Sequence, residues 1–155
     1  MDEGFRLYVE SLHDVFERLK NMPPVTAATL PKILPLECIY LFGEKGRPLY
    51  VGRTRELRRR MRNHCGPASG HNQAVFAFKL ARELTGKTVP GYTAQNSRQT
   101  LLGDNDFLTA FTESKKRVLS MELRFVEERD PLRQTLLEIY VAFVLKTPYN
   151  DFDTH

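Results

Sequence analysis

A single carboxylate interrupts the most apolar stretch of the chain. Glu138 lies within residues 136–145, where the other nine residues are all apolar. A carboxylate in such surroundings costs free energy unless a partner compensates its charge. Two interpretations are open. Glu138 could form an ion pair with an arginine or face water at an edge, or it could bind a divalent metal ion, with the small Ala142 one turn later leaving room for a substrate.

Four other polar side chains could take part in chemistry, although none decides the matter alone. Tyr40 and Tyr50 belong to short apolar runs, where tyrosine most simply packs in a strand. His64 suits either a surface position or a general base. Asn150 follows Pro148-Tyr149 and is most simply a turn residue. The chain has no Ser-His-Asp order, no phosphate-cradling glycine loop and no paired CxxC.

Positive charge is concentrated between Glu44 and His64. Eight Lys and Arg residues against two Glu give this stretch a net charge of +6, whereas the whole chain carries +4. Such a concentration indicates a polyanionic partner. The spacing predicts a helix over 55–64, capped by Thr54, with Arg60 and His64 one turn apart on one face and Arg53 just before it. The other arginines point away from this face and are either solvated or in contact with phosphates: Arg55, Arg58, Arg59 and Arg62.

The remaining patterns predict the elements that position these residues. Two apolar runs, 38–42 and 49–51, flank the turn 43–46 and predict a β-hairpin. Periodic apolar residues predict helices over 5–20, 71–84, 104–116 and 131–146, and alternation predicts a strand over 117–127. Residues 86–103 have the composition of a mobile surface loop. The expected fold is therefore α+β, a small and mainly antiparallel three-stranded sheet flanked by helices.

Length and composition limit the class of protein. A chain of 155 residues, 41% hydrophobic and 27% charged, fits one domain with its own core. Two cysteines, Cys38 and Cys65, favour a reducing intracellular location over a disulfide framework. No run of 18 apolar residues and no signal-peptide pattern occurs. We therefore expect a soluble, cytoplasmic protein without a membrane partner.

Taken together, these residues resemble the GIY-YIG nuclease family. Cys38-Ile39-Tyr40 stands at the first tripeptide of the family, and Tyr50-Val51-Gly52 stands at the second. Arg60 follows Tyr50 by ten residues, at the place of the family's catalytic arginine, and Glu138 on a late apolar helix matches the metal-binding glutamate. Three further positions also match: Arg53, His64 and Asn150.

The resemblance covers about 36–64 and 117–151, and it implies one domain over residues 1–155. That domain would consist of an N-terminal helix (1–22), the hairpin and basic helix (36–64), a helical insertion (65–116) and the closing strand, helix and asparagine (117–151). Cysteine replaces the family's first glycine at position 38, which changes backbone freedom but leaves Tyr40 in place. The insertion has no match, so the DNA structure or sequence that is cut does not carry over from the family, which includes repair, homing, restriction and structure-specific nucleases.

The activity that the resemblance implies is metal-dependent hydrolysis of phosphodiester bonds in DNA. Glu138 would bind one Mg²⁺ or Mn²⁺, and Arg60 would stabilise the charge that develops on the phosphate. Tyr40 would be the general base, with His64 sharing that role, and Tyr50 would orient the water or the phosphate. Arg53 would bind the phosphate, and Asn150 would brace the substrate site. No small-molecule cofactor is implied, and the oligomeric state stays open.

Two hypotheses from other classes compete with the nuclease. A nucleic-acid-binding module of the same fold, with little or no turnover, also explains the basic stretch. Such a module has no need for a carboxylate in the apolar helix, so the combination of Tyr40, Tyr50, Arg60 and Glu138 favours the enzyme. A protein-interaction adaptor would expose the apolar side of the N-terminal helix, and it leaves the basic stretch unexplained.

Overall fold

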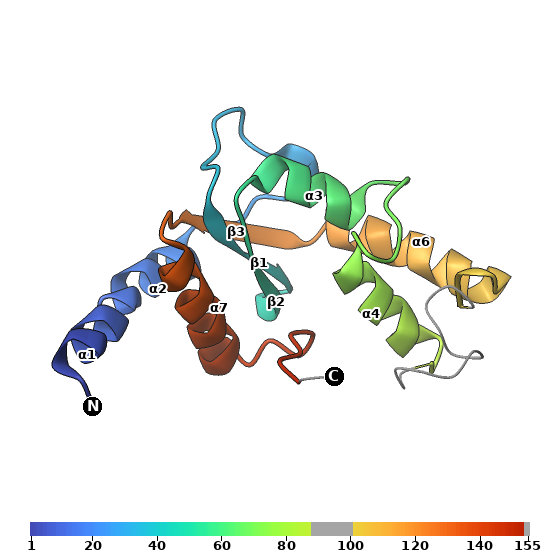
Figure 1. Ribbon diagram of the computed structural model, residues 1–155. Coiled ribbons are helices and arrows are strands. Elements are labelled where there is room, and N and C mark those ends of the chain that lie inside the picture. The colour runs from blue at the N-terminus through green and yellow to red at the C-terminus, as the bar shows by residue number, and fades with distance from the viewer. Residues whose placement is uncertain (88–100, 154–155) are drawn as a thin grey trace. The chain divides into compact units, whose positions relative to one another are not determined.

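The computed structural model describes residues 1–87 and 101–153, which are divided between two compact units. The first unit comprises Met1–Arg58 and Met121–His155, and the second comprises Arg59–Ser120. Helices surround one antiparallel sheet, so the predicted α+β class is confirmed (Figure 1). The predicted single domain over 1–155 stays a prediction. No helix within the described ranges is long and apolar enough to cross a membrane.

The sheet of the first unit is built around the predicted hairpin. Its strands are β1 (Cys38–Glu44), β2 (Arg47–Thr54) and β3 (Glu122–Glu127), in the order β2-β1-β3, and both pairs are antiparallel. The hairpin turn is tighter than predicted, because only Lys45 and Gly46 lie between the strands. Both have positive φ angles, 51° and 75°, as a two-residue turn that matches strand twist requires.

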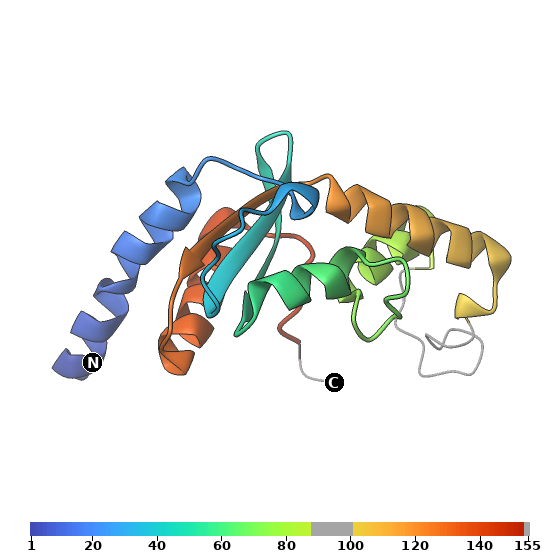
Figure 2. The same cartoon turned by 90° about the horizontal axis from the view of Figure 1, so that it is seen from above.

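The hydrophobic core of the first unit lies between one face of the sheet and the helices α2 (Leu12–Asn21) and α7 (Pro131–Leu145) (Figures 1 and 2). The sheet contributes Ile39, Leu41, Val51 and Val126, all buried. The helices contribute Leu12, Val15, Phe16, Leu19, Leu137, Val141 and Ala142. This face therefore fixes where α7, and with it Glu138, lies against the strands.

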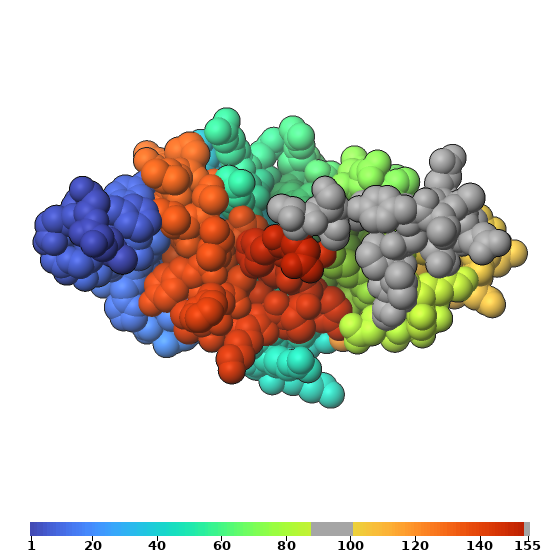
Figure 3. Space-filling model, turned by 60° about the horizontal axis from the view of Figure 1, so that its bottom comes forward, coloured from blue at the N-terminus to red at the C-terminus, as the bar shows by residue number. Residues whose placement is uncertain are grey.

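The apolar helix α7 is not enclosed on all sides. Its outer side leaves Leu132, Ile139 and Phe143 exposed, by 58%, 48% and 82%. Figure 3 shows α7, in orange, along the surface of the first unit. The apolar run of residues 136–145 is thus only half in the core, and Glu138 lies at the border between the core side and the surface side. A carboxylate at such a border keeps part of its hydration.

The N-terminal segment differs from the predicted single helix. It forms α1 (Glu3–Glu10) and α2, with Ser11 ending the first and preceding the second. The apolar residues of α2 are buried, whereas Phe5 of α1 is 47% exposed. Apolar spacing alone could not detect the break at Ser11, because the periodicity continues through it.

The predicted late strand begins five residues later than expected. Residues 117–119 end α6 (Asn105–Leu119), and β3 starts at Glu122. Val118 is completely buried as a helix residue, while Leu119 is 37% exposed. In the strand Leu123 and Val126 are buried, whereas Phe125 is only partly buried. A short segment in which apolar and polar residues alternate is also compatible with the apolar side of a helix, which explains why residues 117–119 were assigned to the strand.

The second unit is helical. Among its described residues, after the last part of α3 (Leu57–Cys65), are α4 (Val75–Leu84) and α6, which pack through Phe78 against Phe107 and Phe111 with ring centroids 5.1 and 5.8 Å apart. Asp104 caps α6 by accepting the backbone N–H groups of residues 106 and 107. The predicted helix over 71–84 starts at Val75 instead, and its last residue, Leu84, is 63% exposed. Most of the predicted loop 86–103 lies outside the described residues.

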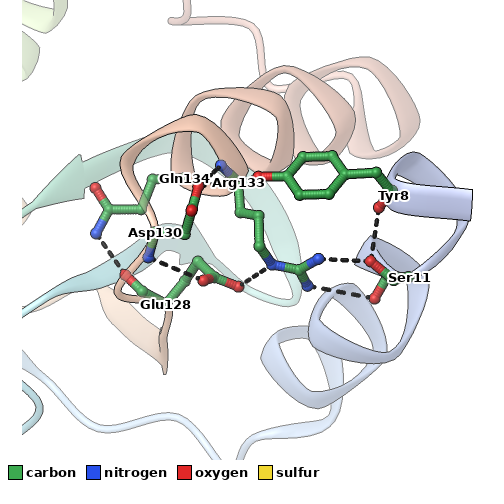
Figure 4. A network of polar contacts seen from close by, with 6 residues as sticks. All are labelled: Tyr8, Ser11, Glu128, Asp130, Arg133 and Gln134. Carbon is green, nitrogen blue, oxygen red and sulfur yellow. Dashed lines mark hydrogen bonds and ion pairs between the residues drawn. The ribbon is translucent and has the colours of Figure 1, made fainter. Parts of the chain in front are cut away.

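A polar network holds the junction of α1 and α2 against the start of α7 (Figure 4). The Arg133 guanidinium donates to Glu128 Oε2 at 2.9 Å and to Ser11 Oγ at 2.5 Å. The Tyr8 hydroxyl donates to Asp130 Oδ1 at 2.9 Å, and Asp130 also caps α7 by accepting the N–H of Arg133. The side chains of Arg133 and Glu128 are only 20% and 11% exposed, so their pairing is screened little by water.

Removing the charge of Arg133 should destabilise the first unit. In Arg133→Gln the buried carboxylate of Glu128 loses its partner, and the free energy of unfolding should fall by about 1–3 kcal/mol. The matched control is Arg129→Gln, because Arg129 also pairs with a glutamate but is 80% exposed. That control should change stability by less than about 0.5 kcal/mol. Urea unfolding measures both, and equal losses would contradict the role of the network.

Candidate active site

Glu138 forms an ion pair with Arg53 at the end of β2. The Arg53 Nε–H donates to Glu138 Oε2 at 3.1 Å, and the two side chains are 46% and 21% exposed. Burial raises the pKa of Glu138 above its ordinary value, while the charge and hydrogen bond of Arg53 act in the opposite direction. The carboxylate is therefore partly desolvated and held by one cation.

This pairing agrees with the first of the two interpretations of Glu138, an ion pair with an arginine. It does not exclude the second, in which Glu138 binds a divalent metal ion. Ion pairs between partly exposed side chains contribute about 0–1 kcal/mol, so Arg53 can leave Glu138 at little cost. A bound phosphate would offer Arg53 an alternative partner of the same charge sign as the carboxylate. The pair thus places a carboxylate and a partly exposed guanidinium side by side.

Tyr40 is packed directly over Gly52 of the neighbouring strand. The two residues are opposite each other in the β1–β2 register. A Cβ atom added to Gly52 would lie 2.3 Å from the Tyr40 hydroxyl and 2.4 Å from Cζ, far closer than real Cβ contacts. The ring is 1% exposed and also meets Phe42 edge-on at 5.9 Å. Only glycine at position 52 allows the hydroxyl of Tyr40 to occupy this place.

The tyrosines and Glu138 approach β2 from opposite faces of the sheet. Ile39, Leu41 and Val51 point to the face that α7 covers, and successive strand residues alternate, so Tyr40 and Tyr50 point to the other face. Arg53, two residues after Val51, is on the same face as α7, in agreement with its bond to Glu138. The polar groups therefore converge on the strand segment 50–53 rather than on one surface of the sheet.

Asn150 braces the outer edge of β2. Its Nδ2 donates to the carbonyl of Val51 at 2.7 Å, and its Oδ1 accepts the Val51 N–H at 2.9 Å. The backbone N–H of Tyr149 donates to the carbonyl of Leu49 at 3.2 Å. The side-chain amide thus replaces a neighbouring strand at an edge that would otherwise lack a partner. It connects the segment after α7 to the strand that carries Tyr50 and Arg53.

Arg60 and His64 belong to the second unit and lie one turn apart on α3, as predicted. The Arg60 Nη1–H donates to the carbonyl of Gln73 at 3.3 Å. The side chain of His64 is 0% exposed, and burial, followed by the charge of Arg60, lowers its pKa well below the ordinary value. His64 is therefore a neutral imidazole at neutral pH.

The cysteine at the family's first glycine position takes no part in this chemistry. Cys38 is completely buried, and burial, followed by the charge of Glu127, raises the pKa of its thiol to about 12. Burial also raises the pKa of Cys65 to about 12. Both cysteines are free, and a thiol with such a pKa stays protonated and weakly nucleophilic.

The donor chemistry of Glu138 fits a hard divalent cation. Among the described residues no group of three or more His, Cys, Asp or Glu side chains is arranged to hold a metal ion. Mg²⁺ needs no such cage, because it keeps several waters and is bound through one or two carboxylates together with phosphates of the substrate. A structural zinc ion, which takes four protein ligands, does not fit.

Sequence reasoning missed two features of this site. Gly52 was noted only as part of the tripeptide, although it makes the space for Tyr40, and a glycine inside a strand is the signal for such a close approach. The partner of Glu138 was left open among the arginines, because nothing in the sequence shows which one faces α7. The alternation of side chains along β2 identifies Arg53 as the partner of Glu138 only when the face of the sheet that α7 covers is known.

Comparison with known proteins identifies the domain. The family model of the GIY-YIG catalytic domain matches residues 36–134, more than half of the chain. The matched range contains Tyr40, Tyr50, Arg53, Arg60 and His64 but ends before Glu138 and Asn150. A search of curated proteins and a search of solved structures each found no match. Nucleases of this family act on DNA and generally use divalent metal ions. The chain belongs to the GIY-YIG family of nuclease domains.

Proposed function

We propose that the chain is a divalent-metal-dependent endonuclease that hydrolyses phosphodiester bonds in DNA. The observation that carries the proposal is the partly buried carboxylate of Glu138, held by Arg53 next to the strand position over which Tyr40 is packed. Glu138 and Asn150 lie beyond the residues that the family match covers, so their roles rest on this arrangement and on their order in the sequence.

Glu138 is the residue that would hold Mg²⁺ or Mn²⁺. The cation would supply positive charge to the scissile phosphate and to the oxygen that leaves. Arg53 would turn from the carboxylate to the phosphate when the substrate binds, because its guanidinium fork fits phosphate oxygens. The pair in the free protein would then be the resting form of the site, with each partner compensating the other's charge.

Tyr40 is our candidate for the group that accepts the proton of the attacking water. Its hydroxyl is fixed over Gly52, which comes one residue before Arg53 in β2, and the assignment rests on the place of Tyr40 at the family's first tripeptide. Tyr50, on the same face of the sheet, would orient the water or the phosphate. Asn150 would keep β2 straight at Val51 between these residues rather than touch the phosphate, because both polar atoms of its amide are bonded to that strand.

Arg60 would stabilise the negative charge that develops on the phosphate, a role that rests on its place in the family's order of residues. His64, a completely buried neutral imidazole one turn from Arg60 on α3, would orient Arg60. We assign the base to Tyr40 because it stands at the family's first tripeptide, and a supporting role to His64.

Loss of the Glu138 charge should abolish cleavage without abolishing DNA binding. Glu138→Gln keeps the shape of the side chain but not its affinity for a cation, so nicking of a supercoiled plasmid in Mg²⁺ or Mn²⁺ should fall at least about 100-fold. The matched control is Glu113→Gln on the exposed surface of α6, which should cleave normally. Cleavage that survives in Glu138→Gln, or in EDTA, contradicts the mechanism. Salt-sensitive binding by the wild type with no cleavage of any DNA supports the binding module instead.

The acid limb of the pH–rate profile should report Glu138. The ionised carboxylate is the active form and its pKa is raised in the metal-free protein, so at metal concentrations well below saturation activity should be lost as the pH falls through a midpoint above that of an ordinary glutamate. Arg53→Gln removes the cation that opposes the shift, and the midpoint should move to still higher pH. Arg53→Lys keeps a positive charge and should leave the midpoint closer to that of the wild type. A midpoint that is unchanged in Arg53→Gln contradicts this assignment.

Gly52→Ala should disable the site by displacing Tyr40. The added methyl group would overlap the Tyr40 hydroxyl and Cζ, and the buried ring cannot turn away without moving Phe42. Overpacking of this kind costs about 1–3 kcal/mol of stability, and cleavage should fall at least about tenfold, as in Tyr40→Phe. Gly70→Ala is the control, because nothing lies within 4 Å of its new Cβ. Normal cleavage by folded Gly52→Ala would show that the position of Tyr40 does not matter.

A further inference from the structure

The connector that leads from η1 (Ala27–Thr29) to β1, residues 30–37, displays apolar side chains to solvent. Ile33 is 93% exposed and Leu36 is 69% exposed. Both belong to the first unit, where the other side chains of comparable size mostly pack in the core. Figure 1 shows the connector as a loop that rises above the sheet at the top of the picture. Apolar side chains raised on a loop in this way do not contribute to the stability of the fold.

Hydrogen bonds from Arg58 hold the connector in place. The Arg58 Nη2–H donates to the carbonyl of Pro31 at 2.6 Å and to that of Lys32 at 3.4 Å. Pro31 and Pro35 lie on either side of Ile33 and restrict the backbone there. The sequence assigned Arg58 to a solvated or phosphate-binding surface, and the structure instead gives it this structural contact. Ile33 is consequently presented by a braced loop.

A pocket opens beside the connector at the end of the sheet where β1 begins and β2 and β3 end. Its volume is about 500 Å³, and it is lined by Leu34, Pro35 and Leu36 together with Arg55 and Arg129. Glu37 and Glu127 complete the lining, and Glu127 accepts from the Nε–H of Arg129. The pocket thus combines an apolar wall with guanidinium and carboxylate groups, which can hydrogen-bond the edges of a base.

The charges around the connector favour a nucleic acid as its partner. Four cations, Lys32, Arg55, Arg58 and Arg129, lie in the connector or beside it. Arg58 holds the connector and Arg129 pairs with Glu127, so Lys32 and Arg55 are the ones placed to meet phosphates. Two exposed apolar side chains are too small an area for a stable protein interface, which needs far more buried surface. Apolar wedges of Ile, Leu or Pro between base steps, flanked by cations on the phosphates, are in contrast a recurrent way of contacting DNA.

We propose that residues 30–37 form a wedge that packs Ile33 and Leu36 against unstacked bases, with an extruded nucleotide entering the pocket beside Arg55. The inference rests on the proposed nuclease function and specifies its substrate. The free energy needed to unstack a base is least where the duplex is mismatched, gapped or already single-stranded. The enzyme should therefore prefer DNA with an unpaired nucleotide over a regular duplex of the same length and sequence.

The test measures binding in the Glu138→Gln background, so that cleavage does not interfere. Two synthetic duplexes are compared, one fully paired and one with 2-aminopurine at an unpaired position. The protein should bind the second duplex at least about tenfold more tightly, and the 2-aminopurine fluorescence should rise as the base leaves the stack. Ile33→Ser with Leu36→Ser should bring the affinity ratio close to one and remove the fluorescence change, while affinity for the paired duplex stays the same.

Two controls separate the wedge from general effects. Leu7→Ser with Val9→Ser removes exposed apolar side chains from α1 and should leave both readouts unchanged. Arg55→Gln should weaken binding to both duplexes and flatten the salt dependence. Equal affinity of the parent for both duplexes, or a preference that persists without Ile33 and Leu36, overturns the wedge. Plasmid nicking by the otherwise wild-type enzyme is scored separately, so failure of the wedge and failure of the nuclease are distinguishable.

Discussion

The register of the β1–β2 hairpin is the constraint on which the rest of the site depends. The two-residue turn at Lys45-Gly46, followed by an irregularity after Phe42, places Tyr40 opposite Gly52. A slip of one residue would turn every side chain of the strand to the other face. Tyr40 would then lose the space that Gly52 provides, and Arg53 would turn away from Glu138. One local pairing thus determines the positions of both Tyr40 and Arg53.

The C-terminal residues secure the same strand from its other side. Asn150 uses both ends of its amide on Val51, and Tyr149 adds a backbone bond to Leu49. These bonds connect β2 to the segment that follows α7, while the core side of α7 packs on the sheet. The distance between the carboxylate of Glu138 and the strand is therefore set at two places. Glu138 lies beyond residues 36–134, which the family model matches, but these bonds and contacts still position it against a strand within that range.

Local chemistry made much of this fold predictable from the sequence. Gly46 in a tight turn and Asp130-Pro131 at a helix start each determine backbone geometry over a few residues. The errors arose where local patterns are degenerate. Apolar periodicity continues through Ser11 although the helix is interrupted, and residues 117–119 satisfy a helix as well as a strand.

The candidate site was proposed from the sequence as a set of residues, and the sequence did not give their arrangement. Glu138 stood out because a carboxylate among apolar residues needs a reason, whereas its partner Arg53 depends on packing between α7 and β2. The opposite faces taken by Tyr40 and Glu138 likewise follow from the side of the sheet on which α7 lies. The packing of α7 on one face of the sheet is determined by the whole core, so no short segment of the sequence predicts it.

The two buried cysteines have a practical consequence for labelling chemistry. With pKa values of about 12 and exposed fractions of 0% and 8%, Cys38 and Cys65 should react slowly with maleimides and disulfide reagents at neutral pH. An exposed thiol added to the native protein should therefore be labelled much faster than either of them. A thiol introduced at an exposed position such as Ile33 would be the one reactive group among the described residues, and a spin label or fluorophore could be attached there without first altering the core.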